Sequence, residues 1–84
     1  MEYQIKFTPF FEKQLKKLKK KDRVLFERLG KKLKEVRKNP EHYEPLKNVL
    51  KGNRRAHLDP SIIVFDIGGD LVTIHYVKHH DDAY

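Results

Sequence analysis

The hydrophobic periodicity of this chain changes twice along its length, and this change limits the folds that it can adopt. Residues 3–7 alternate between apolar and polar side chains, which is the pattern of a strand with one buried face. Apolar residues then recur at helical spacing until Asn39-Pro40, where proline ends the helical pattern. Alternation returns from residue 54 onward. The sequence therefore predicts a single α+β domain over residues 1–84, in which a helical stretch separates an N-terminal strand from later strands.

The helical stretch is predicted to form a basic two-helix hairpin. Thr8 suits the N-cap and Pro9 the first position of a helix that reaches about residue 20. Asp22 is placed to cap a second helix, whose apolar residues keep helical spacing. Thirteen of the nineteen Lys and Arg residues fall between residues 13 and 38, so the hairpin is expected to form a cationic face.

Three strand-like segments follow, at residues 54–58, 61–67 and 71–77. Short turns that contain proline or glycine separate them, which predicts a three-stranded antiparallel meander. Residues 40–52 are predicted to form a loop. The resulting order is β-α-α-β-β-β, with the helical hairpin covering one face of one mostly antiparallel sheet.

Composition excludes several classes of function. The chain has no cysteine, so disulfide bonds, cysteine-ligated zinc and thiol catalysis are excluded. No apolar run is long enough to cross a bilayer, and the start of the chain reads as a strand, so a cytoplasmic protein with no membrane partner is expected. The net charge of +7 favours a polyanionic partner, either a nucleic acid or an acidic protein.

The end of the chain concentrates groups that can transfer protons. His79 and His80 follow the last predicted strand, and imidazole has an unperturbed pKa of about 6.5. Two readings are open: an acid–base centre, or a solvated polar tail. A metal-dependent hydrolase built on these histidines with Asp81 and Asp82 is disfavoured, because adjacent residues on an extended tail diverge. No metal site is therefore predicted.

Two further histidines lie within predicted strands. His57 comes two residues after Arg55, so the two side chains share a face and are placed to flank a phosphate; a structural histidine at a hairpin end is the alternative. His75 is expected to be a partly buried strand residue on the face opposite Ile74 and Tyr76.

Several local motifs accompany this order of elements. They are Glu44-Pro45-Leu46-Lys47, a Gly52-centred turn, Arg54-Arg55, the apolar strand at residues 62–67, and His79-His80 before a terminal aromatic residue. Together with the basic hairpin, they resemble the RelE/ParE superfamily of toxin–antitoxin toxins, and most closely its YoeB-like and YafQ-like branches. The resemblance covers nearly the whole chain and implies a RelE-like fold.

The resemblance also implies an activity and partners. Members of the ribonuclease type cut messenger RNA in the ribosomal A site, and a cognate antitoxin holds each of them inactive. It therefore implies a metal-independent endoribonuclease without a cofactor, whose partners are an acidic antitoxin, the ribosome and messenger RNA. DNA would be contacted only indirectly, through a complex with the antitoxin.

Roles for individual residues follow from the same resemblance. Glu44 matches the general base of the YoeB-like motif, and His80 matches the C-terminal catalytic histidine, which we assign as the general acid. His79 is the alternative acid. Arg55 is expected to stabilise charge in the transition state. The residues expected to bind RNA are Lys47, Lys51, Arg54, His57, Lys78, His79 and Tyr84, the last by stacking on a base.

The sequence departs from the superfamily pattern in the central strand. Many members carry an arginine where this chain has Ile62, and the YafQ-like branch has an arginine where this chain has Tyr76. Either Arg54 or Arg55 replaces the missing phosphate-binding arginine, or catalysis is weak. The second case leaves an alternative function open, namely a non-catalytic module that inhibits DNA gyrase, as the ParE branch does, or that only binds RNA.

Overall fold

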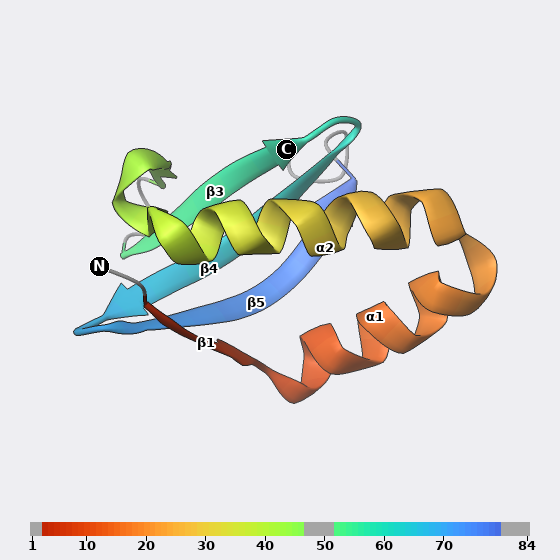
Figure 1. Ribbon diagram of the computed structural model, residues 1–84, viewed down its shortest axis with the longest axis horizontal. Helices are drawn as coiled ribbons and strands as arrows, with labels where there is room; N and C mark the ends of the chain where they lie inside the picture. The colour runs from red at the N-terminus through yellow and green to blue at the C-terminus, as the bar shows by residue number, and fades with distance from the viewer. Residues whose placement is uncertain (1–2, 47–51, 80–84) are drawn as a thin grey trace.

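The computed structural model describes residues 3–46 and 52–79 (Figure 1). Its elements are β1 (Gln4–Phe7), α1 (Pro9–Lys21), α2 (Arg23–Lys38), the short 3₁₀ helix η1 (Pro40–His42), β2 (Glu44–Pro45), β3 (Asn53–Leu58), β4 (Ser61–Gly68) and β5 (Leu71–His79). This order confirms the predicted strand, helical hairpin and later strands. Within the described ranges, neither helix has the length and apolar composition needed to cross a membrane.

The strands form one five-stranded sheet in the order β1-β5-β4-β3-β2. The predicted meander of β3, β4 and β5 is confirmed, because neighbouring strands in it are antiparallel. β1 instead pairs in parallel with β5, since the two helices carry the chain back to the starting end of the sheet before the meander begins. The sheet is therefore mixed.

The prediction of a loop over residues 40–52 was incomplete. The described part of this segment contains η1 and the two-residue strand β2, in which Glu44 pairs with Arg55 and Pro45 with Arg54. Proline lacks an N–H, so its place in an edge strand does not interrupt the sheet. A strand this short shows no alternation in sequence, and only its pairing with β3 defines it.

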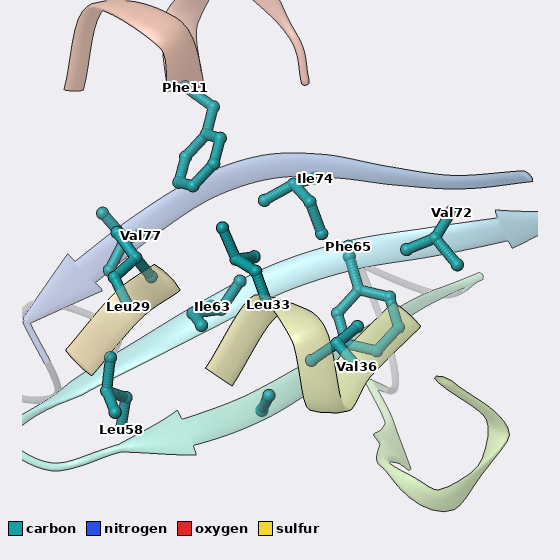
Figure 2. Close-up of a cluster of buried hydrophobic side chains, with 11 residues drawn as sticks. Phe11, Leu29, Leu33, Val36, Leu58, Ile63, Phe65, Val72, Ile74 and Val77 are labelled. Carbon is teal, nitrogen blue, oxygen red and sulfur yellow. The ribbon is translucent and has the colours of Figure 1, made fainter. Parts of the chain in front are cut away.

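The helices and the sheet enclose one hydrophobic core. In Figure 2, Leu29, Leu33 and Val36 of α2 point toward Ile63 and Phe65 of β4. The spacing of the helical residues, i, i+4 and i+7, confirms the predicted amphipathic face. The buried cluster consists of Phe11, Leu29, Leu33, Val36, Ala56, Leu58, Ile63, Phe65, Val72, Ile74 and Val77.

One expectation about β5 was wrong. The register between β4 and β5 shifts between Val64 and Phe65, which pair with Tyr76 and Ile74 respectively. This bulge adds one residue to β5, so the alternation slips and Val77, not Tyr76, joins Ile74 in the core. Tyr76 lies opposite Val64 on the other face of the sheet. A bulge depends on strand pairing, which periodicity along a single strand does not reveal.

Helix α1 is joined to β5 where β1 ends. The Thr8 hydroxyl accepts a hydrogen bond from the Phe11 N–H (3.1 Å), which confirms the predicted N-cap, and donates to the His75 carbonyl (2.9 Å). Further along α1, the Gln14 side chain donates to the Val77 carbonyl (2.8 Å) and accepts from the Val77 N–H (2.9 Å). The Gln14 amide therefore satisfies the backbone of β5 beyond the reach of β1.

We expect Gln14→Ala to lower the free energy of unfolding by about 1–3 kcal/mol, because it removes both hydrogen-bond partners of the part-buried Val77 backbone. Urea denaturation followed by circular dichroism measures this change. Lys13→Ala, at an exposed position on the same helix, is the matched control and should change stability by less than about 0.5 kcal/mol. Equal stability of the two variants would contradict a structural role for the Gln14 amide.

Candidate functional site

The sheet face opposite the helices, here called the open face, carries most of the described candidate residues. Its positions are fixed by register: residues that pair directly across antiparallel strands share a face. Three such rows cross β3, β4 and β5, and they consist of His57, Ile62 and Lys78; Arg55, Val64 and Tyr76; and Asn53, Asp66 and Thr73. Polar side chains from β3 and β5 thus flank two apolar residues of β4, Ile62 and Val64, both of which are buried.

Glu44 and Arg55 meet at one end of this face. β2 and β3 pair these residues directly, and Arg55 Nη2 lies 3.4 Å from Glu44 Oε2. The Arg55 side chain is 20% exposed, whereas the Glu44 side chain is 63% exposed. The expected general base and the expected charge-stabilising residue are therefore brought together, with the carboxylate open to solvent and the guanidinium packed against the sheet.

His57 and Lys78 extend the polar part of the open face beyond Arg55. His57 follows Arg55 by two residues on β3, so the shared face that the sequence predicted is observed. Lys78 lies across β4 from His57, at a backbone separation of about 10 Å, which is two strand spacings. Both side chains are exposed. Three of the residues expected to contact RNA or its transition state, Arg55, His57 and Lys78, thus share one surface.

Arg54 does not belong to this surface. It neighbours Arg55 on β3 and therefore points to the helix side, where its Nη1 donates to the carbonyls of Tyr43 (2.8 Å) and Glu41 (3.4 Å). The Tyr43 ring packs edge-on against Phe65, with ring centroids 6.0 Å apart. Arg54 thus joins η1 to the sheet, and of the two arginines considered as replacements at Ile62, only Arg55 lies on the open face.

Two tyrosines near Arg54 have raised pKa values. Burial raises the pKa of the Tyr43 phenol, and the Glu35 carboxylate raises it further. The Tyr3 hydroxyl donates to Glu41 Oε1 (3.0 Å); this bond is the main reason that the pKa of Tyr3 is raised. Desolvation and the charge of Glu41 add to the shift, and Arg54 opposes it. Both phenols therefore remain protonated at neutral pH, and the Tyr3 hydroxyl bonds to Glu41 of η1.

The structure also reveals a pair that sequence reasoning missed. His75 Nε2 lies 2.5 Å from Asp66 Oδ2, and the two side chains are 35% and 37% exposed. The bulge leaves His75 without a directly paired residue on β4, and its ring turns toward Asp66 on the open face. The expectation that His75 lies opposite Ile74 is confirmed, but Asp66 gave no signal in the sequence because the pairing depends on the bulge.

Lys78 and His79 end β5 and are exposed. They line a groove of about 330 Å³ together with Lys17 and Lys21 of α1, so the cationic surface continues from the sheet onto the helix. Spacing along the chain could not show this junction. The remaining predicted residues, Lys47, Lys51, His80 and Tyr84, lie outside the described residues, as do Asp81 and Asp82. Across residues 3–46 and 52–79, no three His, Asp or Glu side chains cluster as metal ligands.

The sequence and the fold agree with a known class of proteins. Residues 5–84 match the family of ParE toxins of the type II toxin–antitoxin system parDE. A relative from Methanocaldococcus jannaschii, which carries a RelE toxin name, is 35% identical over 98% of this chain and 90% of its own length. The chain therefore belongs to the ParE family of type II toxins, and the resemblance to the RelE/ParE superfamily is confirmed.

Solved structures show the same fold. The toxin–antitoxin complex RelBE2 from Mycobacterium tuberculosis contains a chain with a TM-score of 0.82 and 20% identity, covering 94% of this chain and 92% of that one. The YoeB-YefM complex from Staphylococcus aureus gives a TM-score of 0.78 and 19% identity, covering 95% and 99%. At these identities the likeness concerns the fold, and it confirms the predicted RelE-like α+β architecture.

We expect Arg54→Ala to destabilise the protein by about 1–3 kcal/mol, because the substitution removes a charged donor from two backbone carbonyls of the segment that contains η1. Thermal and urea unfolding would measure the loss. Arg28→Ala, at an exposed position on α2, is the control and should change stability by less than about 0.5 kcal/mol. If Arg54→Ala unfolds like the wild type, Arg54 does not hold η1 to the sheet.

Proposed function

We propose that this type II toxin is a ribosome-dependent, metal-independent endoribonuclease that cleaves messenger RNA in the cytoplasm. The observation that carries the proposal is the pairing of Glu44 with Arg55 on the open face, beside His57 and Lys78. A carboxylate that can accept a proton and cations that can bind a phosphate are the groups that RNA cleavage by a 2′-hydroxyl requires.

The proposed reaction has two proton transfers. Glu44 removes the proton of the ribose 2′-hydroxyl, and the 2′-oxygen attacks the adjacent phosphorus. A bond forms between them, the bond from phosphorus to the 5′-oxygen breaks, and a 2′,3′-cyclic phosphate results. His80 donates a proton to the departing 5′-oxygen, with His79 as the alternative donor. Arg55 stabilises the extra negative charge that the phosphate carries in the transition state.

The other proposed contacts position the RNA. His57 and Lys78 bind phosphate groups on the open face, and we assign the same role to Lys47, Lys51 and His79 from the sequence. Tyr84 is proposed to stack on a base. Arg54 is not proposed to bind RNA, because its guanidinium donates hydrogen bonds to the carbonyls of Glu41 and Tyr43 on the other face of the sheet.

The proposed partner that controls the toxin is an acidic antitoxin. Two observations support it: chains of similar fold occur in toxin–antitoxin complexes, and this chain has a net charge of +7. A cationic toxin attracts an anionic, partly disordered segment that folds on binding. Contact with DNA would occur only through the antitoxin.

A second candidate is a non-catalytic toxin that inhibits DNA gyrase. Two observations favour it: the matched family is that of ParE toxins, and Ile62 occupies the central-strand position where many superfamily members carry an arginine. The two functions predict different damage. A nuclease cuts messenger RNA during translation, whereas a gyrase inhibitor leaves messages intact and causes DNA breaks.

Production of this protein without its antitoxin should stop growth of a bacterial host within a few generations and leave ribosome-associated messages cut. Primer extension on a reporter message and a gyrase cleavage assay on plasmid DNA distinguish the two candidates. Co-production of the cognate antitoxin is the control and should restore growth. Intact messages together with gyrase-dependent DNA breaks would replace the nuclease proposal with the second candidate; normal growth and translation would contradict both.

Glu44→Gln and His80→Ala should each lower single-turnover cleavage on saturated ribosomes by a factor of about 10²–10⁴, the usual contribution of general acid–base catalysis. Ribosome affinity should barely change. A message with a 2′-deoxy sugar at the scissile nucleotide should resist cutting, because the nucleophile is gone, and chelators should have no effect. Glu27→Gln, at an exposed carboxylate on α2, is the matched control.

The same experiment decides which histidine acts. If His79→Ala cleaves normally and His80→Ala does not, His80 is the acid; the reverse result moves the role to His79. Full activity in both variants would contradict the proposal that one of these histidines is the general acid.

A further inference from the structure

A second groove lies at the outer edge of β5, beyond the last residue that β1 covers. It has a volume of about 310 Å³ and is lined by Phe10, Gln14, Tyr76, Val77 and Lys78. Phe10 is 61% exposed, although its neighbour Phe11 is fully buried in the core. The first turn of α1 thus places one aromatic ring inside the molecule and one in solvent at the sheet edge.

The backbone fixes the position of this exposed ring. β1 pairs with β5 only as far as Ile74, and Gln14 then holds the edge through its two hydrogen bonds with Val77. Phe10 precedes Gln14 by four residues, so both side chains project from the same side of α1. The Phe10 ring is therefore held beside the end of β5 by the same contact that attaches the helix.

The groove is continuous with the open face. Tyr76 belongs to the row that contains Arg55, and Lys78 to the row that contains His57. A single-stranded nucleic acid laid across the open face from β3 to β5 would span a backbone distance of about 10 Å. It would reach Tyr76 and Lys78 first and then Phe10. The bulge makes this continuity possible, because it turns Tyr76 toward the open face.

We propose that Phe10 and Tyr76 form a base-stacking subsite for single-stranded RNA, in which Lys78 binds the adjacent phosphate. The inference rests on the proposed RNA-cleaving function and adds a position that binds a nucleotide outside the catalytic pair. Aromatic faces stack on any base, and a lysine beside them attracts the backbone, which is the combination that single-strand binding sites use. None of the five lining residues carries a negative charge, which suits an anionic ligand.

One other large hydrophobic side chain is mostly exposed among the described residues, and it provides a control position. Val24 is 71% exposed in the first turn of α2, but a branched aliphatic group has no flat face on which a base can stack. It is not among the residues that line the groove. Val24→Ala therefore removes a similar kind of exposed apolar surface without touching the proposed subsite.

The test uses the full chain in the Glu44→Gln background and a short single-stranded RNA that carries 2-aminopurine, whose fluorescence falls when it stacks. Phe10→Leu should raise the Kd about 5- to 150-fold and lower the quenching, because stacking on the Phe10 ring is lost while apolar volume and Tyr76 are kept. Phe10→Trp should retain both, and Val24→Ala should match the parent. On ribosomes in the otherwise wild-type chain, Phe10→Leu should raise the concentration for half-maximal cleavage and leave the saturated rate unchanged.

The outcomes separate this inference from the proposed function. If Arg55→Ala weakens RNA binding but Phe10→Leu changes neither affinity nor quenching, the subsite is wrong and the nuclease proposal stands. If Phe10→Leu leaves RNA binding intact but weakens capture of the acidic antitoxin, the groove binds protein and the subsite is likewise overturned. If the Glu44→Gln parent binds no RNA and the wild-type chain cuts no message, both proposals fail together. Circular dichroism of Phe10→Leu checks that the fold is retained.

Discussion

The bulge in β5 is the constraint on which both sides of the sheet depend. Unbroken alternation after Ile74 would point Tyr76 and Lys78 into the core and Val77 to the opposite face. The extra residue reverses this arrangement, so Val77 is buried and the two polar side chains reach the open face. Gln14 holds the end of the strand after the bulge by bonding both polar groups of the Val77 backbone. One irregularity thus completes the core and places a cation on the surface.

Two adjacent residues of β3 have different roles, one in the structure and one in the candidate site. Arg54 and Arg55 are adjacent, yet one binds the carbonyls of Glu41 and Tyr43 and the other lies beside the Glu44 carboxylate. A guanidinium has several donors in a planar group, so it suits both tasks. Because β2 pairs directly with β3, fixing η1 on the helix side also fixes Glu44 on the other side. The stability of η1 and the geometry of the site are therefore linked.

The sequence was sufficient to predict the parts of the fold that local patterns determine. Thr8 and Asp22 cap their helices as expected, because capping depends on a few consecutive residues. The bulge, β2 and the Asp66–His75 pair were not predictable, since each exists only through pairing between distant segments. For the site, the resemblance supplied Glu44 and Arg55; the structure brings these two side chains within 3.4 Å, and their roles stay predictions. The sequence did not show that Arg54 lies on the helix side of the sheet, and the structure was needed to place it.

Ile62 stands where the resemblance to the superfamily led us to expect an arginine, and polar side chains lie on both sides of it. Ile62 is 4% exposed and is paired with His57 on one side and Lys78 on the other. The buried apolar side chain of Ile62 offers no polar group to a ligand, so binding at this point of the open face depends on the side chains of β3 and β5. The positive charge on this part of the open face comes from Arg55 of β3 and Lys78 of β5, and not from the central strand β4. In the proposed reaction these side chains bind the phosphate from both sides, and Arg55 acts where negative charge develops.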